Sequence, residues 1–419
     1  MPSDTKPTKT SPDDPASLQA RDATAKAAAA GLEAFAEKAP GVPVLVGFDG
    51  FVDSIIRVVQ TRQDLDHYTA MPSIKSFGDK IVAADGKSAN FEFVVTQQKL
   101  GGNGPIMANA LLEATLGVSY IGALGHPNLH PVFEEFAATV NAGIGTAYSV
   151  ADPGETDAAE FDNGKLMLGK YAHMAGLDAA MVENALGTAT LEKLATESKL
   201  IGMTNWTMFP RVESLWKRVC ELIPEYADAT MKPYVFVDFA DPAKRDETDL
   251  AGALKLLTQM QSKANVVLGL NLSEGTQVRK VLGLGDFGDD PGDLKARLAI
   301  ETTCSLIRQK LNLTGVIVHP REAAAAAFAP GSKAGHGSSH QEETIARFAG
   351  PFVETPKLST GAGDNFNAGF CLGLLAGLPL EQCLCTGVGT SGFYVRNARS
   401  PKLSELVAFC RELPPPEVV

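Results

Sequence analysis

Short apolar runs alternate with longer amphipathic stretches along most of the chain. A continuous apolar run of about four to eight residues suits a buried strand, whereas apolar residues at helical spacing indicate a helix with one buried face. The predicted strands span residues 42–46, 118–123, 200–204, 234–239, 265–270 and 316–319. The predicted helices include residues 211–226, 249–261 and 293–310. Because strands that alternate with helices form βαβ units, this order predicts an α/β fold with a doubly wound, mainly parallel sheet.

Other segments lack this alternation. Residues 1–15 are rich in proline, threonine, serine and charged residues, which predicts a disordered tail. An alanine-rich helix is predicted for residues 16–38. Residues 54–100 are irregular and polar with short apolar runs, and Asp162-Asn163-Gly164 predicts the turn of a hairpin. We therefore expect one domain with insertions over residues 16–419.

A turn of small residues precedes one of the amphipathic stretches. Gly361, Ala362 and Gly363 have little side-chain bulk, and the helix that follows leaves several backbone N–H groups unpaired. Such a helix start binds anions. A carboxylate repels an anion, so Asp364 suits another task, which is to take a proton from a nucleophile aimed at that anion. The alternative is an ordinary helix start with an acidic residue in its first turn.

Charge and composition disfavour several classes of protein. The 419 residues carry a formal net charge of −12 without a long basic run, so we expect no nucleic-acid partner, and local groups must hold any phosphorylated ligand. The six cysteines contain no CxxC pair, so we expect reduced thiols and a cytoplasmic location. No run of 18 consecutive apolar residues occurs, so we expect neither a membrane span nor secretion.

The segment Thr360-Gly361-Ala362-Gly363-Asp364, followed by Phe366-Asn367-Ala368-Gly369, resembles the carboxy-terminal signature of the ribokinase (PfkB) family of carbohydrate kinases. The resemblance extends over about residues 42–412. It implies a parallel α/β core with a small β lid, inserted at about residues 54–100 and 146–168. It also implies transfer of the terminal phosphate of a nucleotide, with ATP favoured over ADP, to a sugar hydroxyl, and Mg²⁺ as cofactor. One departure is Leu358, where the family usually has Asp or Asn.

Polar residues follow the first predicted strand, where ligands bind in open parallel sheets. Asp53 matches the acidic residue with which ribokinase-like enzymes hold sugar hydroxyls. The spacing from Gly47 to Asp53 is closest to that of the archaeal ADP-dependent sugar kinases. Asp49 is either a second ligand or a turn-former, and we favour the turn.

A pair of glycines introduces the next candidate, at Gly101-Gly102-Asn103. Paired glycines let backbone amides approach a ligand closely, and an amphipathic helix follows. The segment resembles the family's amino-terminal signature, which grips the acceptor, although Ile106 stands where the family commonly has Asn. A Gly-Gly turn before a helix is also common without a ligand, so its place between the two acidic candidates carries the assignment.

Asn271 and Glu274 follow the predicted strand 265–270 and form an NxxE pattern. In ribokinase-like kinases this pattern organises Mg²⁺ and its waters near the nucleotide phosphates, whereas elsewhere it is usually a helix cap. Asp238, at the end of the preceding strand, either supplies a further carboxylate to the ion or caps the Asp241-Pro242 turn.

The resemblance also assigns roles within the Gly-rich turn. Asp364 is the expected general base, and the backbone of Gly361, Ala362 and Gly363, together with its own amide, is the expected anion hole. The expected nucleotide contacts are Asn271, Thr360, Gly361 and Gly363. Residues 387–397 lie where the family forms its adenine pocket, but they lack its usual Ala-Asn-Ala string, so no base contact is assigned.

Some patterns are rejected as sites. Residues 283–288 spell GxGxxG, but they follow a helical stretch and not the strand that a dinucleotide-binding loop requires. The pairs His126–His130 and His336–His340 have helical spacing, but a proline interrupts the first and a Gly-Ser-Ser segment the second, which disfavours metal binding. A P-loop sequence is absent.

The principal alternative to a kinase is a catalytically retired regulator that binds a sugar or a nucleotide on the same scaffold. The retained Asp364 argues against it, while the departures at Leu358 and Ile106 argue mildly for it. For the kinase we expect a small-molecule sugar and a nucleotide as partners, and a homodimer formed through the lid is compatible with this plan.

Overall fold

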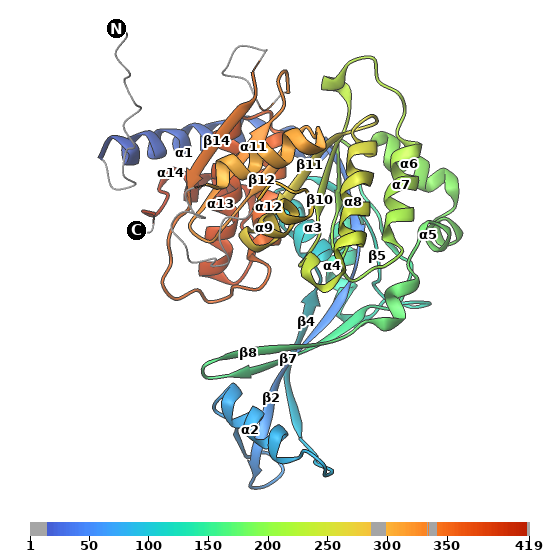
Figure 1. Cartoon of the computed structure of the whole chain (residues 1–419), viewed down its shortest axis with the longest axis vertical. Helices are drawn as coiled ribbons and strands as arrows, with labels where there is room; N and C mark the ends of the chain where they lie inside the picture. Colours follow the sequence, from blue (N-terminus) through green and yellow to red (C-terminus); the bar gives the residue numbers. More distant parts are fainter. Residues whose placement is uncertain (1–14, 286–298, 333, 335–341, 417–419) are drawn as a thin grey trace.

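The computed structural model describes residues 15–285, 299–332, 334 and 342–416 (Figure 1). The tail predicted for residues 1–15 lies outside these ranges, except for Pro15, which begins the first helix. A nine-stranded central sheet is covered by helices, and a second, smaller sheet projects away from this body (Figure 1). The predicted fold class, a doubly wound α/β sheet with a small inserted β lid, is confirmed.

The central sheet is built from short, largely buried strands. In sheet order they are β14 (Thr344–Ala349), β13 (Ala323–Phe328), β12 (Gly315–Val318), β11 (Asn265–Leu270), β10 (Tyr234–Asp238), β9 (Leu200–Met203), β1 (Pro43–Phe48), β5 (Gly117–Gly122) and β6 (Ala147–Ser149). All pairings from β12 to β6 are parallel, whereas β13 and β14 pair antiparallel. The carboxyl ends of the parallel strands therefore meet at one edge, where ligands bind in such sheets.

The hydrophobic pattern predicts six of these strands, namely β1, β5, β9, β10, β11 and β12. It misses β13, which contains five alanines followed by Phe328. Alanine favours helices, so this segment has little strand propensity of its own. It forms a strand because it is buried throughout and hydrogen-bonded to β12 on one side and β14 on the other.

Helices cover both faces of the central sheet (Figure 1). One face carries α1 (Pro15–Phe35), α3 (Asn103–Glu113), α4 (Glu134–Ala142), α12 (Ala362–Leu375), α13 (Leu380–Asn397) and α14 (Leu403–Arg411). The other carries α5 (Ala179–Leu186), α6 (Thr188–Glu197), α7 (Val212–Leu222), α8 (Glu247–Met260), α9 (Leu272–Val281) and α11 (Ile300–Leu311). Alternate residues of β1 serve the two cores: Val44 and Val46 enter the first and Leu45 the second.

Two predicted helices differ from those observed. The helix predicted for residues 211–226 ends at Leu222, because Ile223 is extended before Pro224, as the residue preceding a proline usually is. The helix predicted for residues 293–310 is α11, which begins at Ile300, and residues 293–298 lie outside the described ranges. Within the described part of the chain, no helix is both long and apolar enough to cross a membrane.

The second sheet, which we call the lid, comprises residues 51–101 and 154–170. Its elements are β2 (Phe51–Arg62), β3 (Tyr68–Ala70), α2 (Ile74–Ala83), β4 (Phe93–Gly101), β7 (Gly154–Phe161) and β8 (Gly164–Lys170). Strand β2 pairs antiparallel with β3 and β4 and parallel with β7. The hairpin β7–β8 turns at Asp162–Asn163, where the sequence predicts it. Residues 147–149, predicted as lid, instead form β6 because they pair with β5 in the central sheet.

The lid joins the body through one row of residues across three strands. Phe51 at the start of β2 pairs with Gly101 on one side and Gly154 on the other. A Cβ atom on Gly154 would lie 2.5 Å from the Phe51 ring, and one on Gly50 would lie 2.0 Å from the Ala123 carbonyl oxygen. Glycine is therefore required where the chain passes between body and lid.

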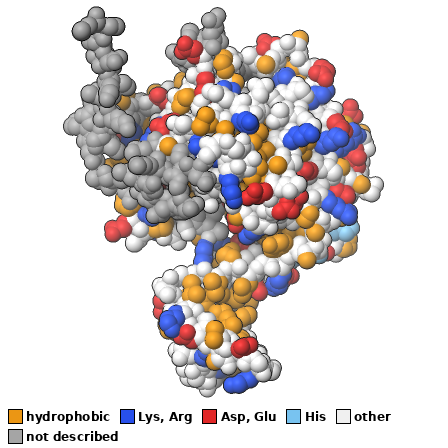
Figure 2. Space-filling view, viewed as in Figure 1, with side chains coloured by type: hydrophobic (Ala, Val, Ile, Leu, Met, Phe, Trp, Pro, Cys, Tyr) orange, Lys and Arg blue, Asp and Glu red, His pale blue; other side chains and the backbone are white. Residues whose placement is uncertain are grey.

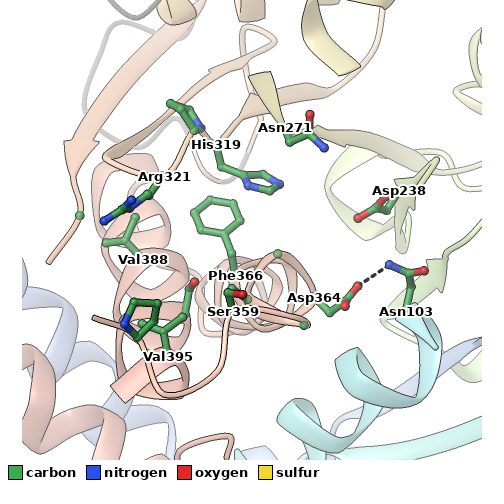
Figure 3. A pocket seen from close by; sticks show the side chains of 18 of the residues that line it. Asn103, Asp238, Asn271, His319, Arg321, Ser359, Asp364, Phe366, Val388 and Val395 are labelled. Carbon is green, nitrogen blue, oxygen red and sulfur yellow. Dashed lines mark hydrogen bonds between the residues drawn. The ribbon is translucent and has the colours of Figure 1, made fainter. Parts of the chain in front are cut away.

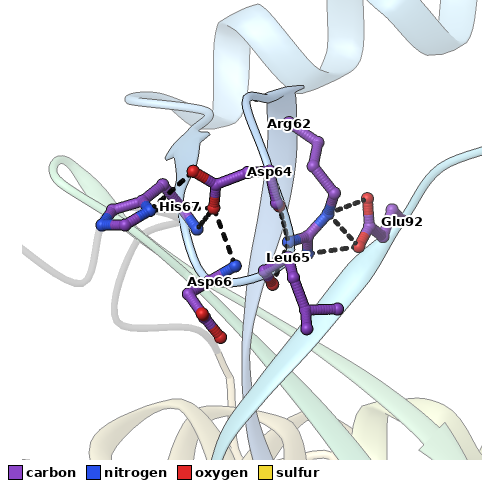
Figure 4. Close-up of polar contacts among 6 residues, drawn as sticks. All are labelled: Arg62, Asp64, Leu65, Asp66, His67 and Glu92. Atoms are coloured by element: carbon purple, nitrogen blue, oxygen red, sulfur yellow. Dashed lines mark hydrogen bonds and ion pairs between the residues drawn. The ribbon is translucent and has the colours of Figure 1, made fainter.

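The far end of the lid is held by its own polar contacts (Figure 4). Arg62 donates from Nε to Glu92 Oε1 at 2.8 Å, which ties β2 to the segment before β4. Asp64 Oδ1 accepts hydrogen bonds from the backbone N–H groups of Asp66 and His67, each at 2.9 Å. These short-range contacts shape the β2–β3 turn, so we assign this end of the lid a structural role.

Candidate active site

The Gly-rich turn lies at the amino-terminal end of α12, as the sequence predicts. Gly361 has φ 90°, and a Cβ atom there would lie 2.9 Å from the Tyr394 hydroxyl, so a larger residue is excluded. The Ala362 amide donates to the Ser359 carbonyl at 3.2 Å, which occupies a group that the sequence places in the anion hole. The amides of Gly363 and Asp364 begin the helix, where N–H groups have no helical carbonyl to bind.

Asp364 joins the two glycine motifs. Its Oδ1 accepts a hydrogen bond of 2.9 Å from the side-chain amide of Asn103, which opens α3 (Figure 3). Both residues line a cavity of about 660 Å³ beside the central sheet. The structure thus brings together two segments that lie 261 residues apart in the sequence.

Asp364 lies in an anionic environment. Its side chain is buried, and burial raises its pKa well above the usual range. The nearby carboxylates of Asp238, Asp49 and Glu274 raise this pKa further, while the hydrogen bond from Asn103 opposes the shift. A carboxylate with a raised pKa binds a proton more tightly, which suits a group that receives one during a reaction.

Asp49 has a different role from either that the sequence suggests. It is fully buried, and its carboxylate accepts hydrogen bonds from the backbone N–H groups of Asn103 at 2.9 Å and Gly104 at 2.8 Å. The Asn205 side-chain amide donates a third at 2.7 Å. Asp49 therefore caps the start of α3, and we do not retain it as a substrate ligand.

Asp53 follows the first strand, as predicted, but it is the third residue of β2 and so already belongs to the lid, for which the sequence predicts a start at about residue 54. It is buried, and a Cβ atom on Gly101 would lie 2.5 Å from its carboxylate, so the glycine leaves the space that the side chain fills. Burial raises the pKa of Asp53, and the positive charges of Lys99 and Lys165 oppose that shift.

Gly102 holds the turn between Asp53 and Asn103. Its φ is 100°, a conformation that favours glycine, and it occupies the N-cap position of α3. A Cβ atom there would lie 3.1 Å from the Asp49 carboxylate. The pair of glycines therefore lets two carboxylates approach the same stretch of backbone, one from the lid and one from the body.

Asn271 and Glu274 form a reciprocal cap at the start of α9. Asn271 Oδ1 accepts from the Glu274 amide and Glu274 Oε2 accepts from the Asn271 amide, both at 2.9 Å. Glu274 Oε1 also accepts from the Asp241 amide at 2.8 Å. Both side chains still line the cavity. Burial, with the nearby Asp238 carboxylate, raises the pKa of Glu274 to about 7.

Asp238 lies at the end of β10 and also faces the cavity. Its Oδ1 accepts from the Ala240 amide at 2.8 Å, and its Oδ2 accepts from the Asn367 side-chain amide at 2.6 Å. It thus shapes the turn before Asp241, one of the two roles that the sequence allows. Burial raises the pKa of Asp238.

Four carboxylate residues line the cavity, and three of them, Asp238, Glu274 and Asp364, are buried and supply hard oxygen donors of the type that Mg²⁺ prefers. Among the described residues, no three acidic, histidine or cysteine side chains converge closely enough to hold a metal ion by themselves. This arrangement fits Mg²⁺, which keeps several of its waters and is usually shared with substrate phosphates. It does not fit a metal such as zinc that needs an all-protein cage.

An apolar wall of the cavity lies beyond these carboxylates, and the sequence interpretation did not identify it. His319, which follows β12, stacks on Phe366 with the ring centroids 4.4 Å apart (Figure 3). Burial lowers the pKa of His319 to about 4, so its ring is neutral near pH 7. Val388 and Val395 of α13 complete this side, within the segment where the resemblance places an adenine pocket. Polar residues at strand ends were the signal available for His319.

Thr360 faces the lid. Its hydroxyl accepts a hydrogen bond from the Lys165 ammonium group of β8, and its backbone carbonyl accepts one of 2.8 Å from the Tyr394 hydroxyl. The sequence predicts a nucleotide contact for Thr360 and contains no signal for Lys165. The lid hairpin therefore reaches the Gly-rich turn directly.

The rejected patterns lie away from the cavity or outside the described ranges. His130 accepts through Nδ1 from the Val132 amide at 3.2 Å and so caps a short helical turn. Gly283 and Gly285 follow α9, whereas residues 286–288 of the GxGxxG pattern lie outside the description. The pair His336 and His340 also lies outside the described residues.

The mainly parallel sheet with helices on both faces and a smaller lid sheet is the ribokinase-like (PfkB) fold. A PfkB protein from Polaromonas sp. JS666 superposes with a TM-score of 0.55 at 16% identity, covering 88% of this chain and 99% of that one. An Arabidopsis thaliana ribokinase, solved with ribose and ATP, gives a TM-score of 0.55 at 14% identity, covering 88% and 98%.

The chain belongs to the prokaryotic ketohexokinase family, whose model matches residues 20–413. A ketohexokinase from Haloferax volcanii is 28% identical over 396 residues, covering 92% of this chain and 95% of that protein. The chain is therefore a PfkB-type carbohydrate kinase, which confirms the predicted family and class of enzyme.

Proposed function

We propose that this protein transfers the terminal phosphoryl group of ATP to a hydroxyl of a ketohexose. The family match supports the class of acceptor. The observation that carries the chemistry is the 2.9 Å hydrogen bond between Asn103 and Asp364, at the point where the acceptor motif meets the Gly-rich turn. This contact supports the proposal because Asp364 is buried at the start of α12, where unpaired N–H groups suit an anion, and lines a cavity large enough for a nucleotide.

In the proposed reaction the acceptor oxygen attacks the terminal phosphorus, and Asp364 receives the hydroxyl proton. The bond from that phosphorus to the bridging oxygen breaks, and the nucleoside diphosphate leaves with the electron pair. The amides of Gly363 and Asp364 donate to the phosphoryl oxygens as charge develops. Closure of the lid keeps out water, which would otherwise accept the phosphoryl group.

Asn271, Glu274 and Asp238 would hold Mg²⁺ through its waters. The ion supplies positive charge that neutralises the phosphate oxygens and orients them. The protein keeps the two carboxylates buried and oriented. The backbone amides of Asp241 and Asn271 donate to Glu274, and that of Ala240 donates to Asp238. Burial raises the pKa of Asp238 and that of Glu274, so a bound cation would favour the charged form of both carboxylates.

The two substrates would occupy opposite ends of the site. The apolar wall of His319, Phe366, Val388 and Val395 suits a nucleobase, because it offers a flat ring pair and aliphatic side chains. Asp53 at the lid suits a polyhydroxylated acceptor, since one carboxylate accepts hydrogen bonds from two adjacent hydroxyls. Asp364 lies between them.

A coupled phosphorylation screen tests the proposal. Ketohexoses, aldohexoses, sugar phosphates and nucleosides are each offered with ATP and with ADP, in the presence and absence of Mg²⁺. We expect Mg²⁺-dependent turnover of a ketohexose with ATP. Preference for ADP would correct the donor. Binding of sugar or nucleotide without turnover in any combination would instead support the retired regulator.

We also propose that the protein forms a homodimer through the lid and works in the cytoplasm. The exposed large hydrophobic residues include Phe93 and Val95 of β4 and Met167 and Leu168 of β8, and hydrophobic side chains gather on the lid in Figure 2. All six cysteines are free and buried, which suits a reducing compartment. Light scattering on Val95→Lys tests the dimer: a variant with the same mass as the wild type would contradict it.

A further inference from the structure

The hairpin β7–β8 carries one cation from the lid to the Gly-rich turn. Its turn is only two residues long, Asp162–Asn163, so Lys165 lies directly behind the tip as the second residue of β8. The Lys165 ammonium group donates a hydrogen bond to the Thr360 hydroxyl. Thr360 directly precedes Gly361, the N-cap of α12.

The position of this contact is fixed from the body side. The Tyr394 hydroxyl, from α13, donates to the Thr360 carbonyl at 2.8 Å. The pKa of Tyr394 is raised by burial and further by the charges of Asp364 and Asp53, so both carboxylates lie near the same phenol. Lys165 therefore meets the turn between the predicted acceptor ligand and the predicted base.

The charge of Lys165 acts in the same place. Asp53 interacts with the positive charges of Lys99 and Lys165. Burial and the neighbouring Lys99 lower the pKa of Lys165, while Glu160 and Asp53 oppose this shift. Lys165 is nevertheless an exposed residue, so a ligand that enters under the lid has access to it.

The site needs such a cation. Carboxylates surround Asp364, and a phosphoryl group in transfer brings further negative charge to the same place. Among the residues lining the cavity, Lys244 pairs with Asp241 at 3.4 Å and Arg321 donates to the Val353 carbonyl at 3.2 Å. Both of these cations are thus engaged with the loops after β10 and β12, whereas Lys165 touches the turn that begins α12.

We propose that Lys165 is a catalytic residue: with both substrates bound, its ammonium group contacts the phosphoryl group in transfer and stabilises its charge. This inference rests on the proposed kinase function. Lys165 keeps its protons throughout, because the hydroxyl proton goes to Asp364 and the leaving diphosphate takes the electron pair. An ammonium group has three N–H donors, so the contact with Thr360 can persist while another donor serves the phosphoryl oxygen.

The alternative is that Lys165 only latches the lid to the body. The two roles separate because a latch needs a hydrogen-bond donor, whereas phosphoryl stabilisation needs a charge. Lys165→Gln keeps a donor and removes the charge, and Lys165→Arg keeps both. Thr360→Val removes the partner of the latch and leaves the charge. Lys170→Gln is the matched control, since Lys170 lies on the same strand and pairs with Glu155 and Asp157 within the lid.

Steady-state kinetics of the full chain with its sugar and Mg-ATP provides the first readout. We expect Lys165→Gln to lower kcat about 10²-fold, the usual effect of losing one transition-state donor, with a change in sugar KM of less than about threefold. Lys165→Arg should recover a large part of that loss. Thr360→Val also alters a predicted nucleotide contact, so we expect it to lower kcat, but by less than Lys165→Gln does. Lys170→Gln should match the wild-type rate.

The second readout is calorimetric binding of ADP, Mg²⁺, sugar and aluminium fluoride, which together mimic the phosphoryl group in transfer. Lys165→Gln should weaken this complex about as much as it lowers kcat, while ADP alone binds as to the wild type. Wild-type kcat in Lys165→Gln would overturn the inference. So would an equal loss in Thr360→Val with raised sugar KM, which indicates a latch. Wild-type turnover and its loss in Asp364→Asn test the kinase function separately.

Discussion

Two buried aspartates stand at two helix starts, and one residue touches both. The backbone amide of Asn103 donates to Asp49, and its side-chain amide donates to Asp364. Asp49 accepts two further hydrogen bonds, from Gly104 and Asn205, at 2.8 and 2.7 Å. Asp364 lines the cavity, whereas Asp49 is fully buried and is not among the residues that line it.

The difference shows what separates a structural carboxylate from a reactive one. Burial raises the pKa of both, so neither burial nor the direction of the pKa shift distinguishes them. Asp49 has its negative charge compensated by three donors and is inaccessible to a substrate. Asp364 is surrounded by other carboxylates, which favour its protonated form. A group of the second kind is suited to accept a proton, and a group of the first kind to hold a helix in place.

The sharpest test of this comparison is Asp364→Asn. An amide cannot accept the hydroxyl proton, so we expect kcat to fall by roughly 10²–10⁴. The fold and the binding of both substrates should persist, since Asn removes a buried charge without changing the shape. Kinetics, thermal melting and calorimetry on the same preparation check all three. A variant that keeps most of its activity would remove Asp364 from the role of base.

Asp49→Ala should lower the stability of the fold, whereas Asp364→Asn should lower the catalytic rate. It leaves three buried donors without their acceptor, so we expect the free energy of unfolding to drop by about 3 kcal/mol. Denaturant titration of Asp49→Ala beside Asp364→Asn measures the contrast directly. If Asp49→Ala is as stable as the wild type, Asp49 is not the cap that the structure indicates.

Asp53→Ala asks whether the lid carboxylate holds the acceptor. Charge-assisted hydrogen bonds contribute about 1.5–3 kcal/mol each, so we expect the sugar KM to rise at least tenfold while nucleotide affinity stays constant. Asp157→Ala is a suitable control, because Asp157 lies on β7 and pairs with Lys170. Unchanged sugar binding with weakened nucleotide binding would mean that the two sites are interchanged.

Glu274→Gln tests whether Glu274 helps to hold Mg²⁺ near the nucleotide phosphates. A neutral amide orders the waters of Mg²⁺ less well than a carboxylate, so the Mg²⁺ concentration for half-maximal rate should rise severalfold, with kcat at saturating Mg²⁺ nearly restored. A titration of rate against Mg²⁺ provides the measurement. Superimposable curves for variant and wild type would leave Glu274 with its helix cap alone.

The same residue predicts a pH dependence of stability. The pKa of Glu274 rises from 4.5 to about 7 on folding, so between these values the folded chain holds a proton that the unfolded chain has lost. Stability from this group is therefore full below about pH 4.5 and is lost as the pH rises towards 7, by roughly 3 kcal/mol. Thermal melts without Mg²⁺ should show this slope, and Glu274→Gln should flatten it. Equal slopes would contradict the assignment.

Much of the fold could be predicted because most strands of the central sheet contain an apolar run that is visible in their own sequence. Strand β11 (Asn265–Leu270) consists of Asn265 and the uninterrupted run Val266–Leu270, which has no polar side chain, and its predicted bounds match those observed. Strand β13 could not be found in the same way, since its alanines become a strand only through their neighbours in the sheet. The hydrophobic pattern thus predicts a strand when the strand's own residues are apolar enough to indicate that it is buried.

The site divides along the same line. The Gly-rich turn at residues 361–364 is a contiguous motif, and its place at a helix start followed from its composition. The contacts of Lys165 with Thr360 and of Asn205 with Asp49 join residues 195 and 156 positions apart. Such a contact cannot be predicted from a short segment, because it depends on how distant parts of the chain are placed together in the fold.

The row of residues at which the lid joins the body also determines how freely the length of the lid can vary. The chain leaves the body at Gly50 and returns at Gly101, and Phe51 and Gly101 are paired neighbours. A segment whose ends lie side by side adds little closure entropy when it is lengthened, so its size is not fixed by the body. Together with the hairpin β7–β8, residues 51–101 have a small core separate from that of the body, around Ile56, Phe77 and Phe161. The length of the lid can therefore change at its glycine-marked base without moving the strand ends of the body.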